Sequence, residues 1–121
     1  MVLTISDLVD TAIAVLPVQK SQLMKQNFAL DGAENASMIT RAEIEHMVRA
    51  IGARKGILDA PWEAITKRVI AKMPIAAQQE LVRWGTTHMG REDIAWMAAC
   101  VSMELRKIVT KSYSYENTQE T

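Results

Sequence analysis

The sequence contains little cysteine, few aromatic residues and no excess of charge of either sign. Its single cysteine, Cys100, cannot form an internal disulfide, which favours a reducing compartment. The formal net charge is zero, from 14 basic and 14 acidic residues, and this argues against a general attraction to nucleic acid or anionic membranes, although a local patch is compatible with it. No run approaches the ~20 apolar residues of a membrane span, and no basic region precedes an apolar stretch at the N-terminus. We therefore expect a cytoplasmic protein without a membrane contact.

The size and composition of the chain are those of one globular domain. Its 121 residues are 49% hydrophobic and 23% charged, so a core is feasible without disulfides or a metal. Eight methionines are many for this length, and three of the six aromatic residues are tryptophan. Methionine fills irregular cores and also lines adaptable binding surfaces, so this composition is compatible with either role.

The segment from Gly90 to Lys111 has the clearest helical pattern in the chain. It continues after Gly90 without glycine or proline, and its apolar residues recur at helical spacing at Ile94, Met97, Ala98, Val101, Leu105 and Ile108. Trp96, Ala99, Cys100 and Met103 widen the apolar surface beyond this stripe. The pattern predicts a central helix that is either enclosed by the fold or shared with a partner chain.

Capping and helix-breaking residues divide the rest of the chain into helices. Thr4 to Asp7 and Thr40 to Glu43 have the form of capping boxes. Pro17 is expected to end or kink the first helix, and Gly85 to end another that begins at Pro74. A third start is predicted at Asp59 to Pro61, with Asp59 or Ala60 as the cap and Pro61 in the first turn. We expect Gly52 and Gly56 to end the helix that begins at Thr40.

These signals predict an all-α fold: a compact bundle of five to six helices around a long C-terminal helix. No strand pattern competes with this interpretation. We expect one helical domain over residues 1–111 and a flexible C-terminal tail over 112–121, where the periodicity ends. The polar, small residues 31–37 predict a flexible loop.

Catalytic and metal chemistry have weak support. Glu43 and His46 have the spacing of a di-metal carboxylate site, but His88 lacks the matching glutamate. Cys100 lies within the predicted long helix, away from a helix N-terminus that would activate its thiol. We therefore expect no enzyme activity, no catalytic or metal-binding residues and no cofactor.

DNA binding is the alternative function. Residues 93–108 resemble the helix-turn-helix pattern of repressors, with Ala99 where the turn glycine belongs; the resemblance implies a DNA-binding regulator. Glycine permits the positive φ of that turn and alanine resists it, so one continuous helix also satisfies the pattern. A basic face is a second basis for binding phosphates. Its candidate nucleic-acid-binding residues are Arg49, Arg54, Lys55, Lys67, Arg68 and Lys72.

Protein interaction is the function that the sequence favours. Trp84, Trp96 and Met103 exceed what the apolar stripes need, and tryptophan and methionine are enriched at interfaces. We therefore expect a small regulatory or adaptor protein that binds another protein or itself, as a homodimer. A turn at residues 99–100 would instead favour the DNA-binding alternative.

Overall fold

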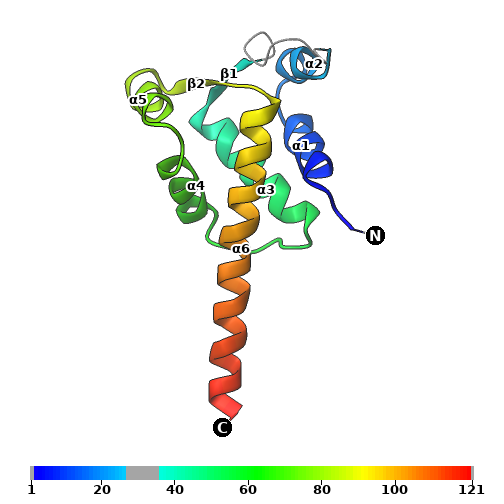
Figure 1. Cartoon of the computed structure of the whole chain (residues 1–121), viewed down its shortest axis with the longest axis vertical. Coiled ribbons are helices and arrows are strands. Elements are labelled where there is room, and N and C mark those ends of the chain that lie inside the picture. Colours follow the sequence, from blue (N-terminus) through cyan, green and yellow to red (C-terminus); the bar gives the residue numbers. More distant parts are fainter. Residues whose placement is uncertain (1, 27–35, 121) are drawn as a thin grey trace.

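The computed structural model describes residues 2–26 and 36–120, and it describes side chains for residues 2–24 and 36–108. Helices form most of this part of the chain, which confirms the predicted helical class (Figure 1). Among the described residues, no helix is long and apolar enough to cross a bilayer. The elements in chain order are α1 (Ile5–Ala14), α2 (Val18–Gln26), β1 (Ser37–Thr40), α3 (Arg41–Arg54), α4 (Trp62–Ala71), α5 (Ile75–Trp84), β2 (Thr86–Met89) and α6 (Arg91–Glu120).

Both predicted capping boxes are present. The hydroxyl of Thr4 accepts a hydrogen bond from the amide of Asp7 at 3.1 Å, and the Asp7 carboxylate accepts one from the Thr4 amide at 2.9 Å. Thr40 and Glu43 make the same pair of bonds at the start of α3, at 3.1 and 2.9 Å. Each box satisfies two amides that have no acceptor inside the helix, so these two helices begin where the sequence predicts.

Two other predicted boundaries are correct only in part. α4 begins after Pro61, and neither Asp59 nor Ala60 caps it, because Pro61 itself is the residue before the first helical turn. α3 does not end at Gly52 but continues to Arg54; Gly56 then adopts a φ of 87° and closes the helix. Amides of residues 56 and 57 bond to the carbonyls of Ala53 and Gly52, the pattern of a Schellman motif.

The expectation that no strand is present is also wrong. β1 and β2 form a two-stranded antiparallel sheet in which Ile39 is opposite Thr87 and Ser37 is opposite Met89. In β1 the side chains of Ser37 and Ile39 are buried, whereas Met38 between them is exposed. Each strand is only four residues long, and its partner lies far away along the chain. Neither segment, Ser-Met-Ile-Thr or Thr-Thr-His-Met, alternates apolar and polar residues, so neither gives a strand signal.

The core lies where α1, α3, α4 and α6 meet, and Figure 1 shows α6 crossing in front of α3. α6 contributes the inward residues that its periodicity predicts, and all of them are buried: Ile94, Met97, Ala98, Val101 and Leu105. α5 is more peripheral, because Leu81 is its only buried residue and its main neighbour is β2. The corner between α4 and α5 is held by the Gln78 side chain, whose amide donates to the carbonyls of Ala71 and Met73 at 3.1 and 2.8 Å.

Two predictions about mobile segments stay predictions. The proposed loop over 31–37 lies largely outside the described residues, which resume at Ala36, and its last residue, Ser37, belongs to β1 instead. The backbone of α6 is helical to Glu120, although the sequence shows no apolar periodicity after Lys111. Side chains beyond Ile108 are outside the described part, and the division into a domain over 1–111 and a flexible tail over 112–121 is not tested by the fold.

Candidate protein-interaction site

An exposed stripe runs along the outward side of α6. Its members recur at intervals of three or four residues, opposite in phase to the buried residues of the same helix, and all are exposed: Glu92, Trp96, Ala99, Met103 and Arg106. We call these residues the outer stripe. Trp96 retains 39% and Met103 52% of its accessible surface, which is high for large apolar side chains at the centre of a helix.

The backbone beneath the outer stripe is firmly positioned. The opposite side of the helix is inserted into the core, where Ile94, Met97 and Val101 have no exposed surface. At the N-terminus the Asp93 carboxylate accepts a hydrogen bond from the Gly90 amide at 2.9 Å, which satisfies a backbone group that the helix leaves free. The outer stripe is therefore a pre-formed surface, and binding there would order little backbone.

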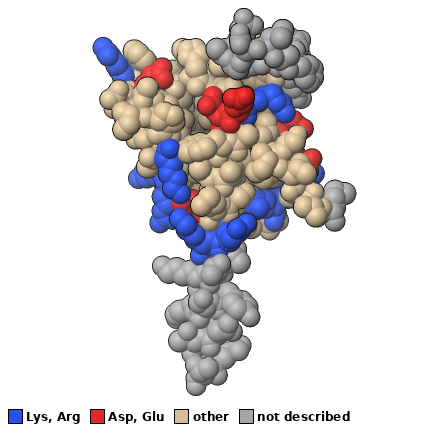
Figure 2. Space-filling model, in the orientation of Figure 1, with Lys and Arg blue, Asp and Glu red and all other residues tan. Residues whose placement is uncertain are grey.

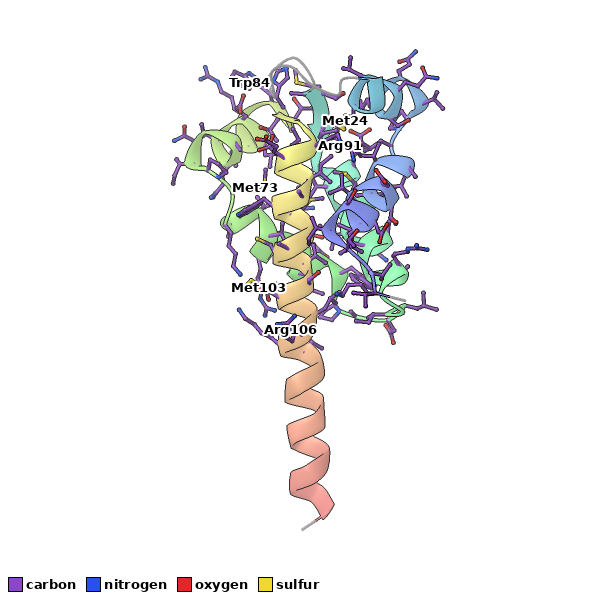
Figure 3. The ribbon with its side chains drawn as sticks, turned by 45° about the vertical axis from the view of Figure 1, so that its right-hand side comes forward. Met24, Met73, Trp84, Arg91, Met103 and Arg106 are labelled. Carbon is purple, nitrogen blue, oxygen red and sulfur yellow. The ribbon has the colours of Figure 1, made fainter. Side chains whose placement is uncertain are left out.

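The structure brings Trp96 and Met103 together but not Trp84. Trp96 and Met103 are two turns apart on one side of α6. Trp84 is the last residue of α5, 63% exposed, with the Arg83 guanidinium 5.4 Å from its ring centroid. Figure 3 shows Trp84 near the top of the molecule and Met103 toward the lower end of the part drawn with side chains. Trp84 stays a predicted contact residue, on a different surface.

α5 carries a second apolar surface that the sequence analysis did not single out. Ile75 and Val82 are exposed one above the other and line a groove with Gln78, Gln79 and Arg83. Their spacing of two helical turns is visible in the sequence. They were missed because the same spacing is expected for a buried side, and only the tertiary packing shows that this side faces solvent.

The predicted basic residues do not form a uniform positive surface. Arg49 lies 3.8 Å from Glu45 and Lys67 3.9 Å from Glu63, both as neighbours along one helix. Arg54 and Lys55 are exposed at the end of α3, where no salt bridge to them exists within the described residues.

Arg68 and Lys72 converge instead on Glu104 of α6, a residue that the sequence analysis overlooked. Lys72 is 3.0 Å, Arg68 3.5 Å and Lys107 3.6 Å from its carboxylate, which is only 4% exposed. The hydrogen bond from Lys72 lowers the pKa of Glu104 despite the opposing effect of burial. This cluster therefore connects α4 to α6 and neutralises part of the basic surface.

The helix-turn-helix interpretation of residues 93–108 is wrong. α6 is continuous from Arg91 through this segment, and positive φ is confined to Gly56 and Gly85 in the described part of the chain. Ala99 is exposed within a regular helical turn, and Cys100 beside it is buried. Without a turn there is no separate recognition helix to place in a DNA groove.

The residues considered for chemistry lie apart from the outer stripe or are already engaged. The Glu43 carboxylate is held by the Thr40 amide and by Lys20, whose Nζ is 2.7 Å away. These bonds lower the pKa of Glu43, although burial acts in the opposite direction. Burial raises the pKa of the Cys100 thiol, which disfavours the reactive thiolate. No group of three or more His, Cys, Asp or Glu residues with metal-binding geometry occurs in the part of the chain that is described.

The outer stripe thus combines exposed apolar side chains with a backbone whose opposite side is anchored in the core. Glu92 and Arg106 were not predicted as members of it, although their phase along the helix follows directly from the buried stripe.

No protein-family model, curated protein or solved structure matches the chain.

Proposed function

We propose that this chain is a non-catalytic regulatory or adaptor protein that acts by protein–protein interaction, with the outer stripe of α6 as its binding surface and self-association as its basic activity. In this proposal the helices form a compact bundle around α6, which contributes one side to the core and the other to a partner. The supporting observation is the exposure of Trp96 and Met103 on one side of α6, whose opposite side is buried from Ile94 to Leu105.

The chemistry of the surface fits a macromolecular partner better than a small ligand. The outer stripe is a convex helix surface, whereas small-molecule sites are concave and enclose most of their ligand. Tryptophan and methionine in such a position are the side chains that protein interfaces favour. Ala99, between them, is small enough to let a second helix approach closely.

Sedimentation equilibrium tests the proposal over about 1 to 200 μM protein, a range that includes the weak association expected of a small interface. We expect concentration-dependent dimers. Trp96→Ala should weaken the dimer about thirtyfold, the effect of truncating a central anchor. Leu58→Ala is the control, because it removes an exposed apolar side chain that lies outside the outer stripe and outside the predicted contact residues. A monomer throughout this range, or equal losses from both variants, would contradict the proposal.

DNA binding through the basic residues is the second candidate function. In its favour, Arg54 and Lys55 are exposed and make no salt bridge in the described region, and Figure 2 shows lysine and arginine side chains along the lower edge of the described body. Phosphate contacts release counterions, so duplex DNA would bind with a steep dependence on salt. Loss of such binding in Arg54→Gln/Lys55→Gln, with the dimer intact, would support this candidate.

A further inference from the structure

The charges of the outer stripe are separated along α6. Glu92 stands at its N-terminal end, and Arg106, followed by Lys107, at its C-terminal end. Trp96, Ala99 and Met103 lie between these charges. Neither Glu92 nor Arg106 forms a salt bridge with another described side chain. The surface therefore has an acidic end, an apolar middle and a basic end.

We infer that the occupant of the outer stripe is a second copy of this chain, with its α6 antiparallel to the first. This inference rests on the proposed function and specifies its partner. Glu92 and Arg106 lie at equal sequence distances on either side of Ala99. A twofold axis near Ala99 consequently places the acidic end of each copy against the basic end of the other, and Trp96 close to Met103 of the second copy.

This orientation follows from the sign of the charges. In a parallel pair, Glu92 of one chain would face Glu92 of the other, and the two Arg106 side chains would likewise face each other. Like charges held opposite one another are unfavourable. The antiparallel pair forms two opposite-charge contacts instead, and its twofold symmetry closes the assembly at a dimer. Ala99 at the crossing point allows the helix axes to approach to about 8–10 Å.

The interface should be weak and sensitive to salt. At ~1.5 Å per residue, the stripe from Glu92 to Arg106 is only about 21 Å long, so it resembles the small interfaces of transient complexes. Its charged contacts lie at the rim, where they are exposed to solvent and are screened by added salt. The apolar middle would then supply most of the affinity, and the charges would select the orientation.

Charge reversal tests the orientation in the full-length chain. Glu92→Arg and Arg106→Glu should each weaken the dimer about tenfold at low salt, because each converts two attractive contacts into two repulsive ones. The double variant Glu92→Arg/Arg106→Glu exchanges the charges and should regain the wild-type affinity. Added salt at about 0.5 M should reduce the differences among these variants. Glu63→Arg is the matched control for Glu92→Arg, because it changes the net charge by the same amount at an exposed position on α4.

The outcomes separate this inference from the proposed function. Dimers that are weakened by Trp96→Ala but unaffected by either reversal, or not restored in the double variant, would overturn the antiparallel arrangement and leave the interaction surface in place. A wild-type chain that remains monomeric would overturn both. Circular dichroism of each variant checks that α6 is intact, because an arginine in its first turn opposes the helix dipole.

Discussion

Gly52 gives the sharpest test of the packing, because two physical effects predict opposite results when it is replaced by alanine. Gly52 lies inside α3, where alanine is favoured over glycine by about 0.8–1.0 kcal/mol. A Cβ at this position would, however, lie 2.6 Å from Cζ3 of the Trp62 indole and closer still to Cη2. The indole is rigid and buried, so relief requires movement of the whole ring or of α4 against α3.

We expect the steric effect to dominate. Overpacking a well-packed site typically costs about 1–3 kcal/mol. Two indole carbons lie within 3.0 Å of the added Cβ, so the cost here should fall in the upper part of this range, about 2–3 kcal/mol. After subtraction of the helix-propensity gain, Gly52→Ala should be destabilised by about 1–2 kcal/mol. Urea denaturation followed by circular dichroism measures this difference. With a slope near ~1.5 kcal/mol/M, the midpoint should fall by about 1 M.

Two further variants make the result interpretable. Ala53→Gly, at the exposed neighbouring position, measures the difference in helix propensity between alanine and glycine in the same turn. It should lower the free energy of unfolding by up to ~1 kcal/mol. Trp62→Leu removes the obstructing ring, and in that background Gly52→Ala should become neutral or stabilising. A Gly52→Ala protein at least as stable as wild type, with no coupling to Trp62→Leu, would refute the reasoning.

Three other predictions concern α6. Leu105→Ala should lower the free energy of unfolding by about 2–5 kcal/mol, and Arg106→Ala by well under ~1 kcal/mol, because only Leu105 is buried; equal denaturation midpoints would contradict the assigned inward side. Cys100 should react slowly with a thiol reagent in the native protein and rapidly after unfolding, since burial raises its pKa; rapid native labelling near neutral pH would show that the thiol is accessible. Glu104→Gln should lower the free energy of unfolding by only about 1–2 kcal/mol near pH 7, because the cations that pair with Glu104 are exposed and solvent screens their attraction to it. Since the pKa of Glu104 is lowered in the folded state, its contribution is present above the unfolded-state pKa and is lost as the pH falls through the folded-state value; a difference between wild type and Glu104→Gln that stays constant down to acidic pH would contradict this.

Features encoded by neighbouring residues were predictable from the sequence. The capping boxes at Thr4 and Thr40 each depend on two side chains three positions apart, and both form. The interruption at Pro17 and the closure of α5 at Gly85 have the same local origin. The inward side of α6 was also predictable, because its apolar periodicity is long and unambiguous.

Features that depend on contacts between residues far apart in the chain were not predictable from the sequence. β1 exists because it pairs with β2, and neither four-residue segment has a distinct pattern of its own. Glu104 is buried where cations from the α4 region reach it, which its position in the sequence does not reveal. Gly52 was interpreted as a helix end, whereas its lack of a Cβ makes room for Trp62. For the candidate site, Trp96 and Met103 were identified, but their separation from Trp84 required the packing of α5.

The contact between the first and last helices has a consequence for the order of folding. α1 packs against both α3 and α6, and β1 cannot complete its hydrogen bonds before β2 is available. Such long-range contacts form only after loop-closure entropy has been overcome, which slows folding relative to a bundle of sequential hairpins. During synthesis, the apolar sides of α1 and α3 would stay open until α6 emerges from the ribosome. The nascent chain is therefore most prone to aggregation just before α6 is made.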